Sequence, residues 1–280
     1  MKTALVTGAS SGIGEATAHL LLKRGYRVYA AARRHDRMQH LEAAGARLIH
    51  LDLTEDASIA AAADAVKAES GRLDALINNA GYGAYGALED VPLAAARRQM
   101  EVNLFGQARL IQLILPLMRA QRAGRIVNVT SIGGKFGEPF GSWYHASKFA
   151  LEGLSDCLRM ELAPLGIKVI VVEPGAIRTE WGGIAGESLL AASGSGPYAE
   201  WAVPHGKVLA SADALADFAS PPEVVAETIA RALKSCRPRT RYATGGRAKT
   251  FMALNWLLSD RIKDRLGRAA FRGYEKKLKA

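Results

Sequence analysis

A tyrosine and a lysine four residues apart, Tyr144 and Lys148, have side chains that suit proton transfer. Residues at this spacing lie on one face of a helix. A phenol with a reference pKa of about 10 is poorly matched to neutral pH, and a nearby ammonium favours its phenolate form. We therefore expect Lys148 to lower the pKa of Tyr144, and Tyr144 to exchange a proton with the oxygen of a carbonyl or alcohol.

Two further polar residues are expected beside this pair. Ser131 ends a predicted strand over 125–130, where its hydroxyl can hold and polarise a substrate oxygen. Asn103 lies within a predicted helix over 92–120 that should run beside the site. Each residue alone has an ordinary structural interpretation. Ser131 can belong to a turn at the end of a strand, Tyr144 can be a core aromatic, and Asn103 can form a hydrogen bond at a helix bend. Taken together, the predicted catalytic residues are Asn103, Ser131, Tyr144 and Lys148.

The elements that must position these residues are indicated by hydrophobic patterning. Apolar β-branched runs alternate with segments of helical periodicity, which is typical of βαβ units around a parallel sheet. The strands are predicted over 3–7, 27–32, 46–51, 73–78, 125–130 and 168–172. The helices are predicted over 13–23, 36–44, 56–69, 92–120 and 143–163, the fourth of them bent near Pro116. Because the strands are nearly all apolar, helices should cover both faces of the sheet. The predicted fold class is α/β, a doubly wound parallel sheet in three layers.

A glycine-rich turn follows the first predicted strand. Its predicted contacts with a cofactor are Gly8, Ser10, Ser11, Gly12, Ile13 and Gly14. Gly8 permits a tight turn, Gly12 lets backbone N–H groups approach a pyrophosphate, and Gly14 allows close packing of the helix. The N-terminus of that helix adds positive potential. Because the turn joins the first strand to its helix, we interpret it as a dinucleotide site rather than a surface turn.

The end of the second strand indicates which dinucleotide binds. A carboxylate is expected there in an NAD site, but Ala32 is followed by Arg33 and Arg34. Guanidinium groups can bind a 2′-phosphate that a carboxylate would repel. The alternative is a solvated arginine pair. We predict NADP(H) as the cofactor.

With these motifs in order, the chain resembles the short-chain dehydrogenase/reductase family in its single-domain form, over about residues 1–235. Besides the residues above, the resemblance rests on Asp52 after the third strand, Asn78 to Gly81 after the fourth, and Pro174-Gly175 with Thr179. It implies a Rossmann fold and hydride transfer between NADP(H) and a carbonyl or alcohol. A non-catalytic NADP(H)-binding sensor or scaffold is the alternative, and the complete set of four catalytic residues argues against it.

The resemblance also implies roles for residues outside the glycine-rich turn. Asp52 and Leu53 would contact adenine, and Asn79, Ala80 and Gly81 would line the adenosine side. Pro174, Gly175, Ile177 and Thr179 would hold the nicotinamide, and Tyr144 and Lys148 its ribose. Asn103 would anchor a water that links Lys148 to solvent. Ala32 with Arg33 resembles NADP-preferring members, whereas Ser11 is not the basic residue that some of them carry.

A stretch over about 176–220 is rich in Gly, Ser and Pro and is expected to be a long irregular segment that binds substrate. Glycines and aromatic residues in this stretch and after Ser131 are candidate walls of an apolar pocket. Alternatively, they only pack the stretch onto the rest of the domain. These residues are Gly133–Phe140, Trp143, Trp181, Tyr198 and Trp201. Glu138 and His205 are expected to be solvated instead.

The C-terminal residues form a basic tail. Residues 237–280 hold 13 Lys and Arg against three Asp and Glu, whereas the rest of the chain is neutral. An apolar repeat predicts one or two amphipathic helices with Ser259 as a cap between them: Phe251, Leu254, Leu258, Ile262, Leu266 and Ala269. We divide the chain into a catalytic domain, 1–246, and this tail, 247–280, which is not an independent domain. The tail resembles the hydroxysteroid and retinol dehydrogenase branch.

Three interpretations of the tail stay open. It packs on the body or on a partner subunit, it contacts a membrane surface, or it recruits an anionic substrate or nucleic acid. Nothing like a nucleic-acid reading motif accompanies the charges, so no nucleic-acid partner is predicted. The predicted partner is a small-molecule carbonyl or alcohol, and a homo-oligomer is compatible with the resemblance.

Composition excludes several other classes of protein. The chain has 280 residues, 49% of them hydrophobic and 23% charged, which is typical of a globular protein rather than a disordered one. Its two cysteines cannot form a disulfide framework, and no metal site is predicted. Without a long apolar run or a secretory signal, the expected location is cytoplasmic.

Overall fold

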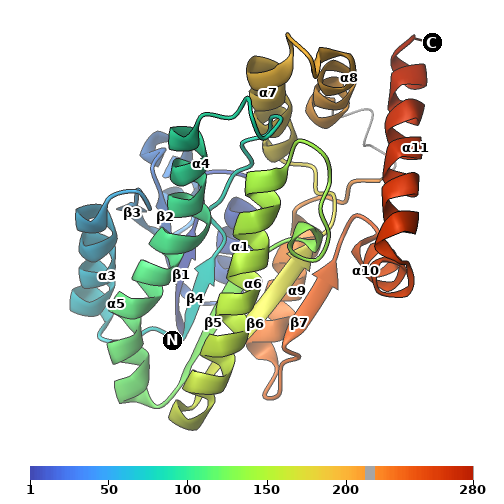
Figure 1. The fold of residues 1–280 in the computed structure, drawn as a ribbon. Coiled ribbons are helices and arrows are strands. Elements are labelled where there is room, and N and C mark those ends of the chain that lie inside the picture. The colour runs from blue at the N-terminus through green and yellow to red at the C-terminus, as the bar shows by residue number, and fades with distance from the viewer. Residues whose placement is uncertain (212–217, 280) are drawn as a thin grey trace.

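The computed structural model describes residues 1–211 and 218–279. In this part of the chain, seven parallel strands form one sheet in the order β3-β2-β1-β4-β5-β6-β7 (Figure 1). The strands are β1 (Thr3–Thr7), β2 (Arg27–Ala32), β3 (Arg47–His50), β4 (Ala75–Asn78), β5 (Gly124–Val129), β6 (Ile167–Pro174) and β7 (Arg241–Thr244). Six of them match predicted strands to within a few residues, and β7 was not predicted.

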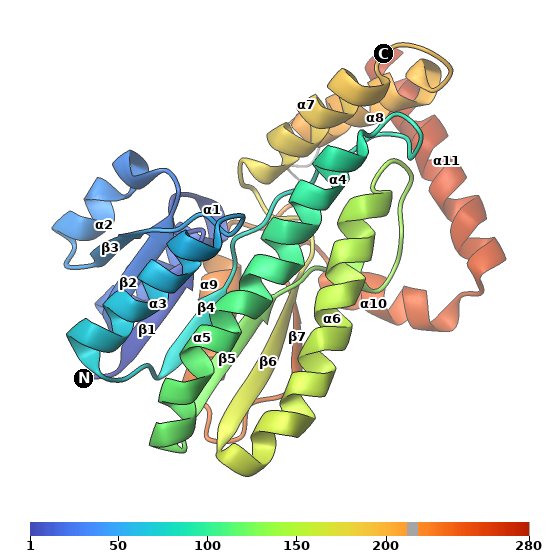
Figure 2. The same ribbon diagram turned by 60° about the vertical axis from the view of Figure 1, so that its left-hand side comes forward.

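Helices cover both faces of the sheet (Figure 2). One face carries α1 (Gly12–Lys23), α2 (Gln39–Ala43) and α9 (Glu223–Lys234), and the other carries α3 (Asp56–Ser70), α5 (Gly106–Gln121) and α6 (Ser142–Leu162). Strand side chains alternate between the two apolar cores, so Ala4 and Val6 enter one and Leu5 the other. The predicted three-layer, doubly wound α/β fold is confirmed.

The order of the strands in the sheet creates a place where a ligand can bind. From β1 the chain builds outward through β2 and β3, and then returns to place β4 on the other side of β1. The connections that follow β1 and β4 therefore diverge, which leaves a crevice at the carboxyl ends of these strands. The glycine-rich turn after β1 and the segment that starts at Asn79 after β4 both line this crevice.

Two predicted helices differ from those observed. The segment over 36–44 is a 3-10 turn, His35–Met38, followed by the short helix α2. The helix predicted over 92–120 is present, but as three consecutive helical segments. A π-helical turn, Glu101–Phe105, separates α4 (Leu93–Met100) from α5, and Pro116 lies inside α5. Such wider turns are frequent at functional sites.

The stretch over 176–220 is mostly helical, so the expectation of an irregular segment was wrong for its described part. It contains α7 (Trp181–Ser193) and α8 (Ala199–Ala210), which pack against each other. A Cβ on Gly186 would lie 2.5 Å from the carbonyl oxygen of Gly206. The glycines that suggested a loop therefore allow two helices to approach closely. Residues 212–217 of this stretch lie outside the described residues.

The tail forms two helices, α10 (Ala248–Leu257) and α11 (Asp260–Lys279), as the apolar repeat predicted. Ser259 lies between them, and its carbonyl accepts from the N–H of Lys263 at 3.0 Å. The Asn255 side chain donates to the carbonyl of Lys135 at 3.0 Å, and Phe251 stacks on Phe136 with ring centroids 6.2 Å apart. The next helix, α11, rises beside α8 (Figure 1). The tail thus packs on the body and extends the crevice.

Within the described ranges, none of the helices combines the length and the apolar character needed to cross a membrane.

Candidate active site

A cavity of about 1630 Å³ opens above the carboxyl ends of the strands. One end of it is lined by the glycine-rich turn and by Asp52, and its centre by Ser131 and Tyr144. The other end is walled by α7, α8, α10 and α11. All predicted cofactor residues except Gly14 therefore line the same continuous space as the tail.

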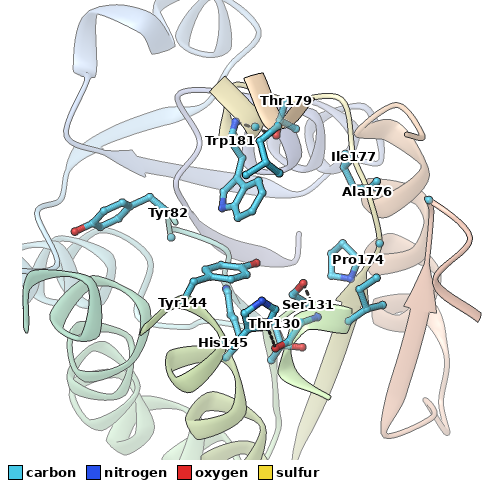
Figure 3. A pocket seen from close by; sticks show the side chains of 18 of the residues that line it. Tyr82, Thr130, Ser131, Tyr144, His145, Pro174, Ala176, Ile177, Thr179 and Trp181 are labelled. Atoms are coloured by element: carbon cyan, nitrogen blue, oxygen red, sulfur yellow. Dashed lines mark hydrogen bonds between the residues drawn. The ribbon is translucent and has the colours of Figure 1, made fainter. Parts of the chain in front are cut away.

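Three of the predicted catalytic residues meet where β5 ends. Tyr144, on α6, is 7% exposed, and its hydroxyl is directed into the cavity with Trp181 on one side and Ser131 on the other (Figure 3). The Ser131 hydroxyl accepts from the backbone N–H of Gly133 at 3.0 Å, and its interaction with the phenol favours the phenolate form of Tyr144. Lys148, one turn further along α6, donates from Nζ to the carbonyl of Val129 at 3.1 Å. Its Nζ lies 5.9 Å from the centroid of the Tyr144 ring.

The titration of this group differs from the expectation. Burial raises the pKa of Tyr144 to about 12, Glu138 adds to the increase, and the interaction with Ser131 opposes it. Burial also lowers the pKa of Lys148 to about 8. The expected lowering of the Tyr144 pKa by Lys148 was therefore wrong, because loss of hydration of the phenolate outweighs the favourable interactions around it. At neutral pH Tyr144 keeps its proton and is suited to donate it.

Asn103, the fourth predicted residue, is fully buried in the π-helical turn. Its Nδ2 donates to the Tyr82 carbonyl at 2.9 Å and to the Ser147 hydroxyl at 3.0 Å, and its Oδ1 accepts from the Tyr82 N–H at 3.1 Å. The Cβ position of Gly81 is 3.1 Å from Oδ1 of Asn103 and 3.6 Å from Nζ of Lys148. Asn103 thus holds in place the segment at Gly81 and Tyr82, which lies against Lys148.

The glycine-rich turn fits a dinucleotide phosphate because side chains are excluded from it. Gly8 and Gly12 have φ angles of +67° and +58°, which favour glycine. A Cβ on Gly14 would lie 2.2 Å from the carbonyl oxygen of Gly8. A Cβ on Gly12 would lie 2.8 Å from Cγ2 of Thr179, so the predicted nicotinamide segment reaches back over the turn. Backbone N–H groups at the start of α1 remain available to a phosphate.

Thr7 ties the turn to the segment after β4 and was missed in the sequence. Its hydroxyl oxygen accepts from the backbone N–H groups of Asn79 and Ala80, both at 3.0 Å. The Asn79 side chain donates in return to the Thr7 carbonyl at 3.0 Å. A threonine at the end of the strand, directly before the glycine-rich turn, was the available signal.

Arg34, one of the two predicted phosphate-binding arginines, lies over the rim of the turn. The Arg34 guanidinium donates to the hydroxyls of Ser10, at 3.3 Å, and Ser11, at 3.0 Å, and pairs with Glu180 at 3.0 Å. Arg37, which the sequence analysis did not select, also pairs with Glu180. These contacts gather guanidinium groups where the second strand ends.

Arg33 lies on the adenine side of the cavity, where its Nη1 is 3.9 Å from Oδ2 of Asp52. Burial favours the neutral form of Asp52, but hydrogen bonds from Thr54 and the charge of Arg33 together lower its pKa. On the opposite side, Pro174 ends β6, and Ile177 pairs with Ser220 in an isolated β-bridge. The residues predicted for adenine and for nicotinamide thus lie on opposite sides of the glycine-rich turn.

Aromatic rings surround the Tyr144 phenol. The ring of Trp181, a predicted pocket wall, is 5.0 Å from that of Tyr144 between centroids. Tyr85, which the sequence analysis missed, is 5.8 Å from it and 1% exposed. Glu138 and His205 also line the cavity, and Glu138 accepts from the Tyr85 hydroxyl at 2.6 Å. His205 is buried, so the expectation that it is merely solvated was wrong, whereas the Glu138 side chain stays 34% exposed while it bonds to Tyr85.

Residues 2–187 match the family described as short chain dehydrogenase. Along nearly its whole length, the chain is 32% identical to the NADPH-dependent 3-dehydrocapnine reductase of Ornithobacterium rhinotracheale, with 95% of this chain and 96% of that protein covered. It is 42% identical to the 3-ketodihydrosphingosine reductase of Bacteroides thetaiotaomicron over 175 residues. That match covers 62% of this chain and 64% of the relative, just under two thirds of its length.

Among solved structures, a short-chain dehydrogenase from Streptomyces avermitilis is 36% identical and superposes with a TM-score of 0.78, covering 99% of this chain and 97% of that one. The family match, the full-length relative and this structure agree with the seven-stranded sheet described above. The chain therefore belongs to the short-chain dehydrogenase/reductase family.

Proposed function

We propose that this protein uses NADPH to reduce the ketone of a molecule with a long apolar chain. The observation that carries the proposal is a protonated phenol, Tyr144, beside Ser131 in a cavity that extends to apolar side chains at α10, Phe251, Leu254 and Leu258. Two relatives are named as reductases of 3-ketodihydrosphingosine and 3-dehydrocapnine, and the former is a lipid.

The proposed reaction divides the work between four side chains. NADPH supplies a hydride to the carbonyl carbon when it is bound. Ser131 holds the carbonyl oxygen, and Tyr144 donates its proton to that oxygen as negative charge develops on it. The Lys148 ammonium stabilises the resulting phenolate, and Asn103 positions the chain beside Lys148.

NADP(H) is supported as the cofactor by charge and by similarity. Arg33 and Arg34 stand where an NAD site has a carboxylate, and Arg34 already binds the two serine hydroxyls of the phosphate turn. The full-length relative is named as NADPH-dependent. In the proposed complex Arg34 exchanges its exposed pairing with Glu180 for the 2′-phosphate.

Replacing Arg34 by alanine should raise the KM for NADPH by about 10- to 100-fold, because a charge-assisted hydrogen bond to phosphate is lost. The KM for NADH should change by less than about threefold, since NADH has no 2′-phosphate. Steady-state kinetics with both cofactors measures this difference. Arg47→Ala, which removes a surface pair with Glu69, is the matched control. Equal effects of Arg34→Ala on both cofactors would contradict the assignment.

The rate of ketone reduction should fall at alkaline pH. The pKa of Lys148 is lowered to about 8, so Lys148 loses its positive charge as the pH rises through that value. Tyr144, with a pKa raised to about 12, keeps its proton over the same range. We expect kcat to be level below about pH 7.5 and then to decrease, approaching about tenfold per pH unit. A wild-type profile that stays level to about pH 10 would contradict this role, and Lys23→Met should keep the wild-type profile.

The substrate class is tested with ketones of increasing chain length. Each methylene buried against walls such as Leu254 and Leu258 contributes about 0.8 kcal/mol, so KM should fall about three- to fourfold per added carbon. NADPH oxidation measured by absorbance gives these values directly. Equal KM values for short and long ketones would contradict an apolar-chain substrate. Cofactor binding without turnover of any carbonyl compound would instead favour the sensor or scaffold.

We also propose that the tail contacts an anionic membrane surface. On α10, Trp256 and Leu257 are 84% and 68% exposed, and exposed Lys249 and Arg261 flank them in the sequence. Vesicles containing phosphatidylglycerol should sediment the full chain, and Trp256→Ala should weaken this binding. Failure of the wild-type chain to sediment would leave α10 and α11 as walls of the cavity alone.

A further inference from the structure

The cofactor end of the cavity holds an anion that belongs to the protein itself. Oε2 of Glu180 accepts from Nη1 of Arg34 at 3.0 Å, and Oε1 of the same carboxylate accepts from Arg37. The hydrogen bonds from Arg37 and from Arg34 lower the pKa of Glu180. Glu180 is therefore ionised at neutral pH, and it occupies the guanidinium group that we assign to the 2′-phosphate.

Each nitrogen of the Arg34 guanidinium is already engaged. Nε and Nη2 both donate to the Ser10 hydroxyl at 3.3 Å, Nη2 also donates to the Ser11 hydroxyl at 3.0 Å, and Nη1 donates to Glu180. A hydroxyl that accepts from arginine can still donate its own proton to a phosphate, whereas a carboxylate can only accept. Two anions that share one guanidinium also repel each other. The two serines are thus compatible with a bound phosphate, and Glu180 competes with it.

The exposure of these pairs allows a ligand to displace them. The side chains of Arg34, Arg37 and Glu180 are 43%, 46% and 41% exposed. Ion pairs at such positions are weak because water and salt screen them. A doubly charged phosphate forms stronger charge-assisted bonds with guanidinium groups and can take the place of the carboxylate. NADH has no 2′-phosphate, so it leaves the pairs with Glu180 intact.

The chain on both sides of Glu180 leads from the phosphate turn to the catalytic centre. Before it, Thr179 lies against the turn, where a Cβ on Gly12 would be 2.8 Å from Cγ2 of Thr179. After it, Trp181 begins α7 and lies beside Tyr144, with ring centroids 5.0 Å apart (Figure 3). Three consecutive residues thus connect the phosphate turn, the arginines and the proton donor.

We propose that Glu180 is a specificity-determining residue that holds the start of α7 against the cofactor site until a 2′-phosphate displaces it. Displacement frees the start of α7 and Trp181 with it, so that NADPH opens the space beside Tyr144 to the ketone and NADH does not. The inference rests on the proposed function, because Arg34 is the residue assigned there to the 2′-phosphate.

Binding of adenosine 2′,5′-bisphosphate and of AMP, measured by calorimetry, tests the competition without turnover. Glu180→Gln keeps the shape of the side chain and removes its charge. It should bind the bisphosphate about three- to tenfold more tightly than the wild-type chain does, and AMP with an affinity within about twofold of the wild-type value. Glu187→Gln, at an exposed position of α7, is the matched control and should change neither affinity. Weaker or unchanged binding of the bisphosphate by Glu180→Gln would overturn the inference.

Tryptophan fluorescence tests the release of α7. The bisphosphate should change the emission of the wild-type chain, because Trp181 leaves its contact with Tyr144, whereas AMP should not. Trp181→Phe should abolish this change, which assigns the signal to that residue, and Glu180→Gln should show the released emission without any ligand. An emission change that is the same for both nucleotides, or that persists in Trp181→Phe, would overturn the coupling of Glu180 to the catalytic centre.

Kinetics with the two cofactors separates this inference from the proposed function. At saturating NADH, Glu180→Gln should lower the KM for the ketone by about three- to tenfold, and at saturating NADPH by less than about twofold. An unchanged KM with NADH would overturn the inference and leave the proposed function standing. If the wild-type chain binds the bisphosphate no more tightly than AMP, the assignment of Arg34 to the 2′-phosphate is wrong instead. A lack of ketone reduction would overturn the proposed function, and the binding and fluorescence measurements would still decide the role of Glu180.

Discussion

Tyr144→Phe should lower kcat for ketone reduction by about 1,000-fold, because the variant has no proton to donate to the substrate oxygen. The substitution removes only the hydroxyl. The ring contacts with Tyr85 and Trp181 remain possible for phenylalanine, and the loss of one hydroxyl costs at most about 1 kcal/mol of stability. NADPH affinity should therefore stay within about threefold of the wild-type value.

Three measurements separate a chemical role from a structural one. Single-turnover kinetics reports the proton-transfer step, fluorescence titration reports NADPH binding, and thermal unfolding should show a change in Tm of only about 2–4 °C. Tyr26→Phe removes a hydroxyl at a half-buried site away from the cavity and is the matched control. A Tyr144→Phe variant that reduces ketones at a rate near that of the wild-type chain would refute the assignment.

Gly14→Ala should weaken NADPH binding by about 100-fold or more. The added Cβ would lie 2.2 Å from the carbonyl oxygen of Gly8 and 2.6 Å from Nδ2 of Asn79, and neither group has room to move without opening the turn. The backbone N–H groups that we expect to hold the pyrophosphate would shift with it. Overpacking of this kind also costs about 1–3 kcal/mol of folding stability.

Gly153→Ala is the matched control for this variant. Both glycines lie in helices, where alanine is favoured over glycine by about 1 kcal/mol. A Cβ on Gly153 would meet no atom within 4 Å, so this substitution should raise Tm slightly and leave NADPH binding unchanged. If Gly14→Ala binds NADPH as tightly as Gly153→Ala does, the close approach at Gly14 is not needed for cofactor binding.

The sequence determined those features that depend on neighbours along the chain. Hydrophobic patterning predicted six of the strands, because a strand covered on both faces must be almost wholly apolar. The glycine-rich turn and the four-residue spacing of Tyr144 and Lys148 were equally local. Together they identified the fold and the family, both of which are confirmed.

Helix packing decided what the glycine-rich stretch over 176–220 becomes. Gly186 and Gly206 are about 20 residues apart in the sequence, and only their contact in space explains why both are glycine. The same stretch looked irregular because glycine lowers helix propensity, whereas close packing of α7 on α8 compensates for it.

The chemistry of the candidate site also depended on the tertiary structure. Loss of hydration raises the pKa of Tyr144, and this burial comes from segments distant in the sequence, among them Trp181 on α7. Glu138, which looked merely solvated, also bonds to Tyr85 and lies 3.7 Å from His145, although its side chain stays 34% exposed. Sequence spacing therefore determined which groups are present, and burial decided their charge, because hydration depends on every element packed around a side chain.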